Sequence, residues 1–499
     1  MTADETLSSH SIGAFPEVVA GRINRGARFC GLFASTRGDD TQLIAVLAEN
    51  GSLDTEKVVV SAGAGSYPSL TSRVPAAAWY EREIRDLFGL HPDGHPRLDP
   101  LILPMPSGSA RPRPGSGVAT GALELDLTPL HVHLAGEGVF TIPYGPVRSG
   151  VFEAVEYVVE TPGETIPLLR TRVFYKHRGV ESRFAGMSVD DGVLLAERCE
   201  GVASVAHAIA FCGAVERLAG VDASTEAGLV RVLHAELERV ANHLDSTIRH
   251  TEAAGQAVAF SRFSLHKERV QRLRARLCGS RFSRGVVVPG GVAGPPALDA
   301  TEVRAAIGQL EAGISADARL LLATPSFVDR LRETGVITPE IAHRYWALGP
   351  IGRGSGQSED VRFARPYGAY GRLGHPLLEP RDEGDALARQ RVRLDEIDGS
   401  FHLIRQAVDD LGGFGDPDRA LWRRPLPDAT GETLGWAEAP QGEVLYLVEL
   451  DEGRIVRAKP RSASFHNLAL FSMAFPNDIL TDFAFIEASF GVSIAGVAN

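Results

Sequence analysis

Two stretches of the chain concentrate side chains that could exchange protons. FYKHRGVES at 174–182 and LAERCEGVASVAH at 195–207 together carry His177, Arg178, Glu181, Arg198, Glu200 and His207. A carboxyl group in a partly buried site can have a raised pKa and pass protons, which makes Glu200 the first candidate. Two simpler interpretations stay open. Glu200 could form an ion pair with Arg178 or Arg198, and His207 could be a hydrogen-bonded core histidine rather than a proton relay.

The cysteines argue against a metal or cluster that this chain holds by itself. The four are Cys30, Cys199, Cys212 and Cys278. No two of them form the Cys-x-x-Cys pair that a structural zinc or an iron–sulfur cluster normally uses. We therefore expect reduced and mostly buried thiols. Glycine-rich stretches such as GRGSG lack the strand–GxGxxG–helix context of a dinucleotide site, so we expect no NAD binding.

Composition and charge exclude several classes of protein. Of the 499 residues, 44% are apolar and 23% are charged, which is typical of a globular protein. The net charge is -12 and no Lys/Arg stripe is present, so we expect no binding to nucleic acid. The N-terminus is polar and no run of about 20 apolar residues occurs, so neither a secretory signal nor a membrane span is predicted. We expect a cytoplasmic protein that reaches a membrane only through partners.

The spacing of apolar residues predicts an α+β protein in two parts. LIAVLAENG and EKVVVSAG are typical of short strands, and AAWYEREIRDLFGL of an amphipathic helix that Gly89 ends. Residues 104–122 are rich in Pro, Gly and Ser, as linkers are. We predict a small mixed-sheet domain at 1–103, a linker at 104–122 and a large helix-rich domain at 123–499. In the large domain we expect strands in VFEAVEYVVE and TRVFYKH, helices at 190–219, 226–250, 258–280, 300–318 and 384–411, and a final hairpin of EVLYLVEL and GRIVRAK.

The end of the first part carries its most distinctive stretch, YEREIRDLFGLHPDGHPRL. Its many charges could simply be a solvated helix face. As a whole, however, it resembles the signature of the 30-kDa-type subunit of respiratory complex I. The matched residues are Glu81, Arg82, Glu83, Asp86, Leu87, Phe88, Gly89, Gly94, His95 and Pro96. The resemblance implies that this segment docks against a large subunit rather than taking part in chemistry.

Eight stretches of the second part, from about Gly145 onward, match one family in order. They are FYKHRGVES, LAERCEGVASVAHAIAFCGAVERLAG, VRVLHAELERVANHL, VVVPGGV, GPIGRGSG, ARQRVRLDEI, GWAEAPQGE and SASFHN. This part resembles the large subunits that complex I (its 49-kDa-type subunit) shares with energy-converting [NiFe] hydrogenases. A short linker between the two domains is similar to the fused arrangement of formate-hydrogenlyase-type large subunits.

The resemblance implies where a nickel–iron centre would lie, and the chain departs from the family there. Such a centre is held by four thiolates from two Cys-x-x-Cys motifs. Here the corresponding positions hold Glu200 and Ala203, and then Ser493 and Gly496. None of these side chains is a thiolate, so nickel binding is not expected. The chain also ends at Asn499, about where hydrogenase precursors of this type are cut, so we expect no such maturation.

The resemblance to complex I also implies a cavity in which quinone accepts electrons from a partner's iron–sulfur cluster. In that family a His and a Tyr hold the quinone headgroup. Here Arg148, in GPVRSGVF, stands at the His position and Gly201 at the Tyr position. Arg148 could still polarise a carbonyl oxygen, although a structural arginine is the simpler interpretation. We therefore name Arg148 and His177 as candidate residues of an acceptor cavity, and Glu200, His207, Arg178 and Glu181 as candidate catalytic residues.

Together, these features imply a subunit of a membrane-associated oxidoreductase, peripheral on the cytoplasmic side of the membrane. The implied partners are a small iron–sulfur subunit and antiporter-like membrane subunits. Three hypotheses follow. In the first, the cavity reduces an unusual quinone or another small acceptor. In the second, the chain is a redox-inactive scaffold that transmits conformational change or protons. In the third, the chain is a nickel hydrogenase with an unrecognised ligand set, which the missing cysteines argue against.

Overall fold

The N-terminal part contains a three-stranded antiparallel sheet and the predicted amphipathic helix. The computed structural model describes residues 11–106, 109–114, 125–126, 134, 136, 138–148, 153–376, 378, 380–412 and 422–499. The elements of this part are α1 (Phe15–Asn24), β1 (Arg28–Arg37), β2 (Asp40–Glu49), β3 (Ser52–Val60), β4 (Ser66–Pro68), α2 (Ala78–Phe88) and β5 (His91–Asp93). Strands β1, β2 and β3 pair in that order, and β4 pairs with β5 in parallel. The predicted strands are confirmed. The helix end is also confirmed, because Gly89 has a φ of 75°, which favours glycine.

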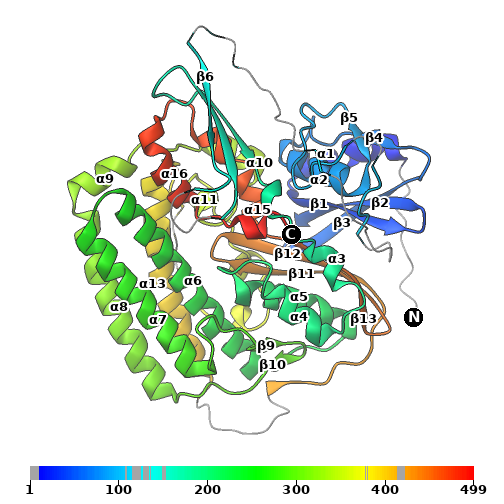
Figure 1. Cartoon of the computed structure of the whole chain (residues 1–499). Helices are drawn as coiled ribbons and strands as arrows, with labels where there is room; N and C mark the ends of the chain where they lie inside the picture. Colours follow the sequence, from blue (N-terminus) through cyan, green and yellow to red (C-terminus); the bar gives the residue numbers. More distant parts are fainter. Residues whose placement is uncertain are drawn as a thin grey trace.

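Long helices dominate the second part, as the sequence predicts. Helices α6, α7, α8 and α13 lie side by side as a bundle, with apolar side chains of all four in one core (Figure 1). The helices are α3 (Val180–Phe184), α4 (Val189–Ala196), α5 (Ser204–Ala219), α6 (Thr225–Ala253), α7 (Ala257–Cys278), α8 (Ala300–Leu322), α9 (Pro325–Leu331), α10 (Pro339–Tyr345), α11 (Gly349–Arg353), α12 (Val361–Ala364), α13 (Ala386–Asp410), α15 (Ala463–Leu468) and α16 (Phe483–Phe490). The α+β fold class is confirmed.

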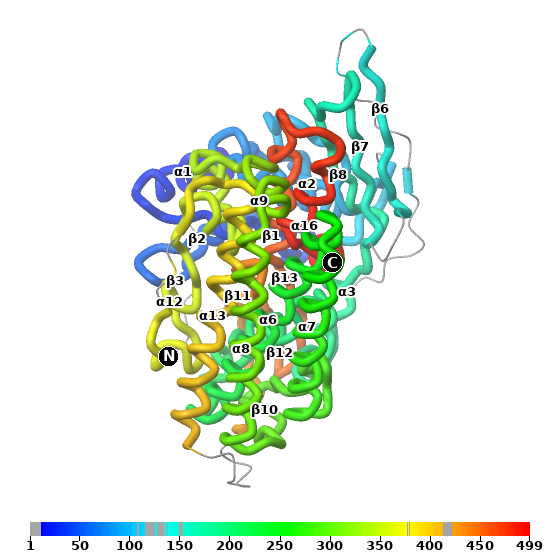
Figure 2. Tube along the Cα trace, turned by 90° about the vertical axis from the view of Figure 1, so that its left-hand side faces the viewer, coloured from blue at the N-terminus to red at the C-terminus, as the bar shows by residue number. Residues whose placement is uncertain are grey.

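Three further groups of strands complete the second part. Strands β6, β7 and β8 form an antiparallel sheet that projects beyond the helices in both views (Figures 1 and 2). The predicted C-terminal hairpin is confirmed and forms a sheet with one more strand. The strands are β6 (Phe140–Tyr144), β7 (Glu156–Thr161), β8 (Leu168–Arg172), β9 (Val287–Val288), β10 (Gly291–Val292), β11 (Gly431–Ala439), β12 (Gly442–Asp451) and β13 (Arg454–Arg461).

One predicted helix is wrong in its extent. Residues 190–219 do not form a single helix, because α4 ends at Ala196 and α5 begins at Ser204. The carboxylate of Glu238, on α6, accepts the N–H groups of Val205 (2.9 Å) and Ala206 (3.1 Å) at the start of α5. A side chain from another helix therefore provides the cap that a helix N-terminus needs, and this long-range contact has no local sequence signal.

Strand β12 is buried on both faces, and this holds the two parts of the chain together. Side chains alternate between the faces of a strand. Leu445 and Leu447 pack with Phe33 and Ile44 of the N-terminal sheet. The opposite face of β12 packs against α5, as the contact of Tyr446 with the α5 residues shows. The C-terminal sheet therefore lies between the N-terminal sheet and α5.

In the described part of the chain, the apolar cores before and after the predicted linker are continuous. One core cluster joins Phe15 and Tyr80 of the first part with Tyr157, Phe465 and Phe483 of the second. Residues 107–108 and 115–122 of the predicted linker lie outside the described residues, and the boundary at 104–122 stays a prediction.

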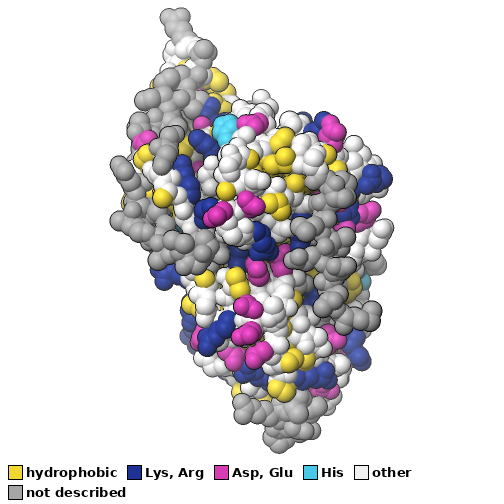
Figure 3. Space-filling view, turned by 90° about the vertical axis from the view of Figure 1, so that its right-hand side faces the viewer, with side chains coloured by type: hydrophobic (Ala, Val, Ile, Leu, Met, Phe, Trp, Pro, Cys, Tyr) yellow, Lys and Arg dark blue, Asp and Glu magenta, His cyan; other side chains and the backbone are white. Residues whose placement is uncertain are grey.

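On the face in Figure 3, acidic and basic side chains are interspersed. In the described part of the chain, no helix combines the length and the apolar character needed to cross a bilayer.

Buried charges cross the contact between the two parts. Lys459, on β13, donates to Glu83 of α2 at 2.6 Å and lies 3.3 Å from Glu181 of α3. Nearby, the hydroxyl of Tyr80 is 2.8 Å from Nδ1 of His466, and both residues are buried. Helix α2 thus docks on the second part through its charged residues, as its resemblance to the 30-kDa-type signature implies.

We expect Lys459→Met to lower the free energy of unfolding by about 3–5 kcal/mol, because it leaves the buried carboxylate of Glu83 without its cation. The matched control is Arg304→Met, which removes an exposed pair with Asp409 (side chains 46% and 63% exposed). That change should cost at most about 0.5 kcal/mol. Urea unfolding of both variants measures the difference. Equal losses in the two variants would show that the buried pair contributes no more than an exposed one.

Candidate functional site

Glu200 lies in the turn between α4 and α5 with its side chain wholly buried. Its Oε2 is 3.2 Å from Nε2 of His207, and its Oε1 accepts a hydrogen bond from the hydroxyl of Ser464. The hydroxyl oxygen of Ser464 accepts the backbone N–H of Ser493 at 3.0 Å. A buried carboxylate needs partners of this kind to offset its lost hydration. A continuous polar chain therefore runs from Ser493 through Glu200 to His207.

The same chain continues beyond His207, which lies on α5. Its Nδ1 is 2.9 Å from the hydroxyl of Tyr446, and that hydroxyl donates to Sγ of Cys199 at 3.3 Å. Burial alone would lower the pKa of His207, but its interactions with the nearby Cys199 and Glu200 outweigh burial and raise this pKa to about 9. His207 is a buried, hydrogen-bonded core histidine, and at neutral pH it is the cation that pairs with Glu200.

The predicted ion pair of Glu200 with Arg178 or Arg198 is wrong. Arg178 donates instead to three backbone carbonyl oxygens, those of Arg198 (2.8 Å), Cys199 and Ala495 (2.7 Å). The Arg198 side chain is 52% exposed and lies 3.8 Å from Glu197. The guanidinium of Arg178 thus donates to carbonyl groups of the turn before α5 and of the C-terminal segment, and this holds the two segments together.

The positions that would hold nickel ligands in the family lie together around Glu200. A Cβ added at Gly496 would be only 2.7 Å from Cδ of Glu200, so the carboxylate fills the space beside that glycine. The N–H of Ala203 donates to the backbone oxygen of Glu200 at 3.2 Å, and Ser493 reaches Glu200 through Ser464. Among the described residues, no three His, Cys, Asp or Glu side chains are placed to hold one metal ion. The side chains at these four positions are one carboxylate, one methyl, one hydroxyl and one hydrogen, with no thiolate among them.

Glu181 and His177 belong to a separate cluster. Glu181 pairs with Arg457 and Lys459. Burial would raise the pKa of Glu181, but the two cations outweigh burial and lower it. Burial and the positive charge of Lys459 together lower the pKa of His177 to about 4, so its imidazole is neutral at pH 7. Glu181 is thus a structural ion-pair partner rather than part of the chain around Glu200.

Arg148 lines a cavity of about 220 Å³ beside this polar chain. Its guanidinium is 2.8 Å from Oε1 of Glu487, and it lies over the ring of Tyr157 at 5.2 Å. The hydroxyl of Tyr157 donates to the same carboxylate at 3.1 Å. Gly201 and Ser493 line this cavity too, but His177 does not. The structure therefore places Arg148 and Gly201 in the lining of one cavity and leaves His177 outside that lining.

A second cavity, of about 440 Å³, adjoins the first. Glu487 and Arg249 line both cavities, so they lie at the junction. Most of the other lining residues of the second cavity are apolar: Ile142, Tyr144, Ala253, Leu480, Phe483, Ala484 and Ala488. The two cavities thus form an apolar chamber and a polar chamber, with the Arg148–Glu487 pair at their junction.

Sequence reasoning missed three residues of the site. Tyr446 lies in a strand with no feature that marks it. Ser464 lies in SASFHN, one of the matched stretches, and Glu487 is the lone charge in the apolar stretch FAFIEASF. A charge in such a stretch is a usable signal, because a buried carboxylate requires a cation.

Comparison with known proteins finds two family models and several relatives that match the chain. The models for the 49 Kd and 30 Kd subunits of respiratory-chain NADH dehydrogenase match residues 254–425 and 24–110. The chain is 29% identical to formate hydrogenlyase subunit 5 of Escherichia coli (83% of this chain, 73% of that protein). It is 28% identical to hydrogenase-4 component G of the same organism (87% and 76%). It is 30% identical to an NADH-quinone oxidoreductase subunit of Streptomyces coelicolor (69% and 91%).

The raised pKa of His207 predicts how stability depends on pH. Below its ordinary pKa of 6.5, His207 is protonated in the folded and unfolded states, and its pairing with Glu200 contributes in full. As the pH rises through about 9, the folded state loses this proton and the contribution is lost. The difference in free energy of unfolding between wild type and His207→Asn should therefore fall by about 3 kcal/mol across this range.

Urea unfolding at several pH values, from below 6.5 to above 9, measures this difference. The comparison with His207→Asn cancels the titration of groups that do not interact with His207. Glu238, whose pKa burial raises to about 7, does interact with it, so its change of pKa contributes to the measured difference near neutral pH. A difference that stays constant over the whole range would mean that His207 is not charged in the folded protein.

Proposed function

Because the chain belongs to the family of large subunits that complex I shares with energy-converting hydrogenases, and carries the 30-kDa-type domain as well, we propose that it reduces a quinone or a similar small acceptor. As a member of this family, it is a subunit of a complex-I-like or hydrogenase-like oxidoreductase complex. The proposed electron donor is an iron–sulfur cluster of a small partner subunit. Antiporter-like membrane subunits are the other proposed partners, with this chain peripheral on the cytoplasmic side.

The pair of adjoining cavities is the observation that carries this proposal. An amphipathic acceptor needs an apolar space for its tail and a polar space for its headgroup. The chamber lined by Phe483 and Leu480 offers the first, and the chamber of Arg148 and Tyr157 offers the second. Arg148 would donate a hydrogen bond to a carbonyl oxygen of the headgroup and stabilise the negative charge that builds up on reduction.

We also propose that no nickel–iron centre takes part. Glu200, Ala203, Ser493 and Gly496 offer no thiolate, and the carboxylate of Glu200 already fills the space beside Gly496. Hydrogen splitting would need such a centre, so it forms no part of the proposed function.

The polar chain of buried residues suggests how protons reach the headgroup. Ser493 lines the polar chamber, and hydrogen bonds lead from it through Ser464 to Glu200 and His207. Burial raises the pKa of Glu238 to about 7, although the nearby positive charge of His207 acts to lower it. Glu238 can therefore change protonation near neutral pH. In this proposal, Glu200 takes a proton from His207 and passes it to the Ser464 hydroxyl, which releases its own proton toward the chamber while the headgroup is reduced. The backbone N–H of Ser493 only donates, so it positions Ser464 and does not carry the proton.

The second candidate is a redox-inactive scaffold of the same kind of complex. The observation in its favour is that Glu200 already has a cation and a hydroxyl donor, which is also how a purely structural carboxylate is satisfied. The two candidates differ in whether the purified complex reduces an added acceptor.

In the purified complex, Arg148→Gln should lower kcat/KM for a short-chain quinone by roughly tenfold to a hundredfold, since a charge-assisted hydrogen bond to the headgroup is lost. The double variant Arg148→Gln with Glu487→Gln removes the carboxylate left unpaired, and it should assemble normally but stay slow. Arg319→Gln, an exposed change elsewhere, is the matched control. A full kcat/KM in both Arg148 variants would exclude Arg148 from the acceptor site, and a wild-type complex that reduces no quinone would favour the scaffold.

Glu200→Gln should impair turnover or proton coupling with little effect on assembly. Glutamine keeps the shape and can hydrogen bond to His207 and Ser464, but it cannot carry a proton. Turnover is measured together with proton uptake in the purified complex, with the exposed Glu17→Gln as the matched control. Unchanged turnover and unchanged proton uptake would leave Glu200 as a structural ion-pair partner.

A further inference from the structure

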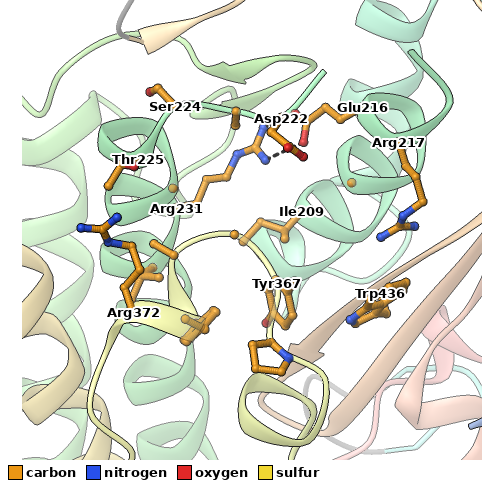
Figure 4. Close-up of a pocket in the computed structure, with 18 residues that line it drawn as sticks. Ile209, Glu216, Arg217, Asp222, Ser224, Thr225, Arg231, Tyr367, Arg372 and Trp436 are labelled. Carbon is orange, nitrogen blue, oxygen red and sulfur yellow. Dashed lines mark hydrogen bonds and ion pairs between the residues drawn. The ribbon is translucent and has the colours of Figure 1, made fainter. Parts of the chain in front are cut away.

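A cavity of about 500 Å³ lies against α5, and none of Ser464, Glu200 and His207 lines it (Figure 4). Its walls come from α5, the start of α6, residues 366–372 and β11. It shares no lining residue with the two acceptor chambers. Its volume falls within the range of roughly 300–1,000 Å³ that is usual for small-molecule sites.

The charges around this cavity favour an anion. Inside it, Arg231 and Glu216 neutralise each other, with two nitrogen–oxygen contacts of 3.0 and 2.5 Å. At the opening, Arg217 and Arg372 are exposed cations, and Asp222 is an exposed carboxylate. Figure 4 shows the two arginines on opposite sides of the opening. The opening therefore has one positive charge more than negative, whereas the chain as a whole has a net charge of -12.

The walls also offer flat and apolar surfaces. The ring of Trp436 lies beneath the guanidinium of Arg217 at 4.3 Å, and Tyr367 stands in the wall next to it. Ile209 and Val232 supply apolar side chains, and an added Cβ at Gly213 would touch nothing within 4 Å. A planar ring can pack against such a wall, and the guanidinium can then reach its anionic group.

We propose that this cavity binds a small organic anion that combines a flat ring with phosphate groups, such as a nucleoside diphosphate. Two arginines on opposite sides of the opening suit a ligand with charge spread over more than one group. This proposal does not depend on the acceptor chemistry above, because the site has its own walls and charges. The positive N-terminal end of the 29-residue helix α6 adds to the attraction, since Thr225 lies in the wall.

Calorimetric titration of the full chain with ADP tests the proposal. We expect saturable binding of ADP, with adenosine and pyrophosphate each binding more weakly because each supplies only the ring or only the charge. Added salt should weaken the binding of ADP, because the two arginines face solvent. Arg217→Gln and Arg372→Gln should each raise the Kd for ADP by roughly fivefold, and Asp222→Asn should lower it.

Arg319→Gln, an exposed arginine on α8, is the matched control and should leave the Kd unchanged. Arg372 is exposed, so its replacement should leave the melting temperature unchanged, and a lost signal in that variant reports binding rather than folding. Arg217 also packs on Trp436 and donates to the carbonyl of Leu434, so the melting temperature of Arg217→Gln is measured beside its Kd. Absence of saturable ADP binding by the wild-type chain, or a Kd that neither arginine variant changes, would overturn the proposal. So would equal binding of ADP and adenosine, since charge would then play no part.

Discussion

The constraint on which the site depends is that Glu200 carries a carboxylate where water cannot reach it. An ionised carboxyl group without partners costs several kcal/mol in such a place. The fold supplies a cation in His207 and a hydroxyl donor in Ser464. To bring these groups together, the chain must leave the helix between α4 and α5, and Arg178 must hold that turn against the C-terminal segment. The local backbone therefore follows from the electrostatics of one side chain.

The same constraint fixes how the N-terminal part is attached. Lys459 is buried, and it stays charged because Glu83 and Glu181 approach it from the two parts of the chain. Apolar contact between β12 and the N-terminal sheet gives the larger stabilisation, since it removes whole side chains such as Leu445 and Phe33 from water. Such contact is tolerant of small shifts, whereas a buried ion pair is not. The apolar faces thus hold the two parts together, and the charges set the position in which they meet.

The sequence predicted what depends on local periodicity and missed what depends on distant partners. The long helix at 226–250 and the end of α2 at Gly89 follow from residue spacing and from glycine geometry, and both are confirmed. The break before α5 was not predicted, because its cap, Glu238, is 33 residues away. Ser464 is 264 residues from Glu200, so no local pattern could pair them. Nearby residues suggested Arg178 or Arg198 as an ion-pair partner for Glu200, and the fold gives it His207 and Ser464 instead.

Glu200 and Gly496 act as one unit in this structure. The carboxylate fits because position 496 has no side chain, since even a single carbon there would lie 2.7 Å from Cδ of Glu200. A cysteine at 496 alone would therefore push the carboxylate away from His207 and Ser464, which hold it through hydrogen bonds. Removing the carboxylate alone would take away a partner that keeps His207 protonated, and burial would then favour the neutral imidazole. The packing here thus depends on both residues together, because a change at either one alone would disturb the hydrogen bonds that hold the carboxylate.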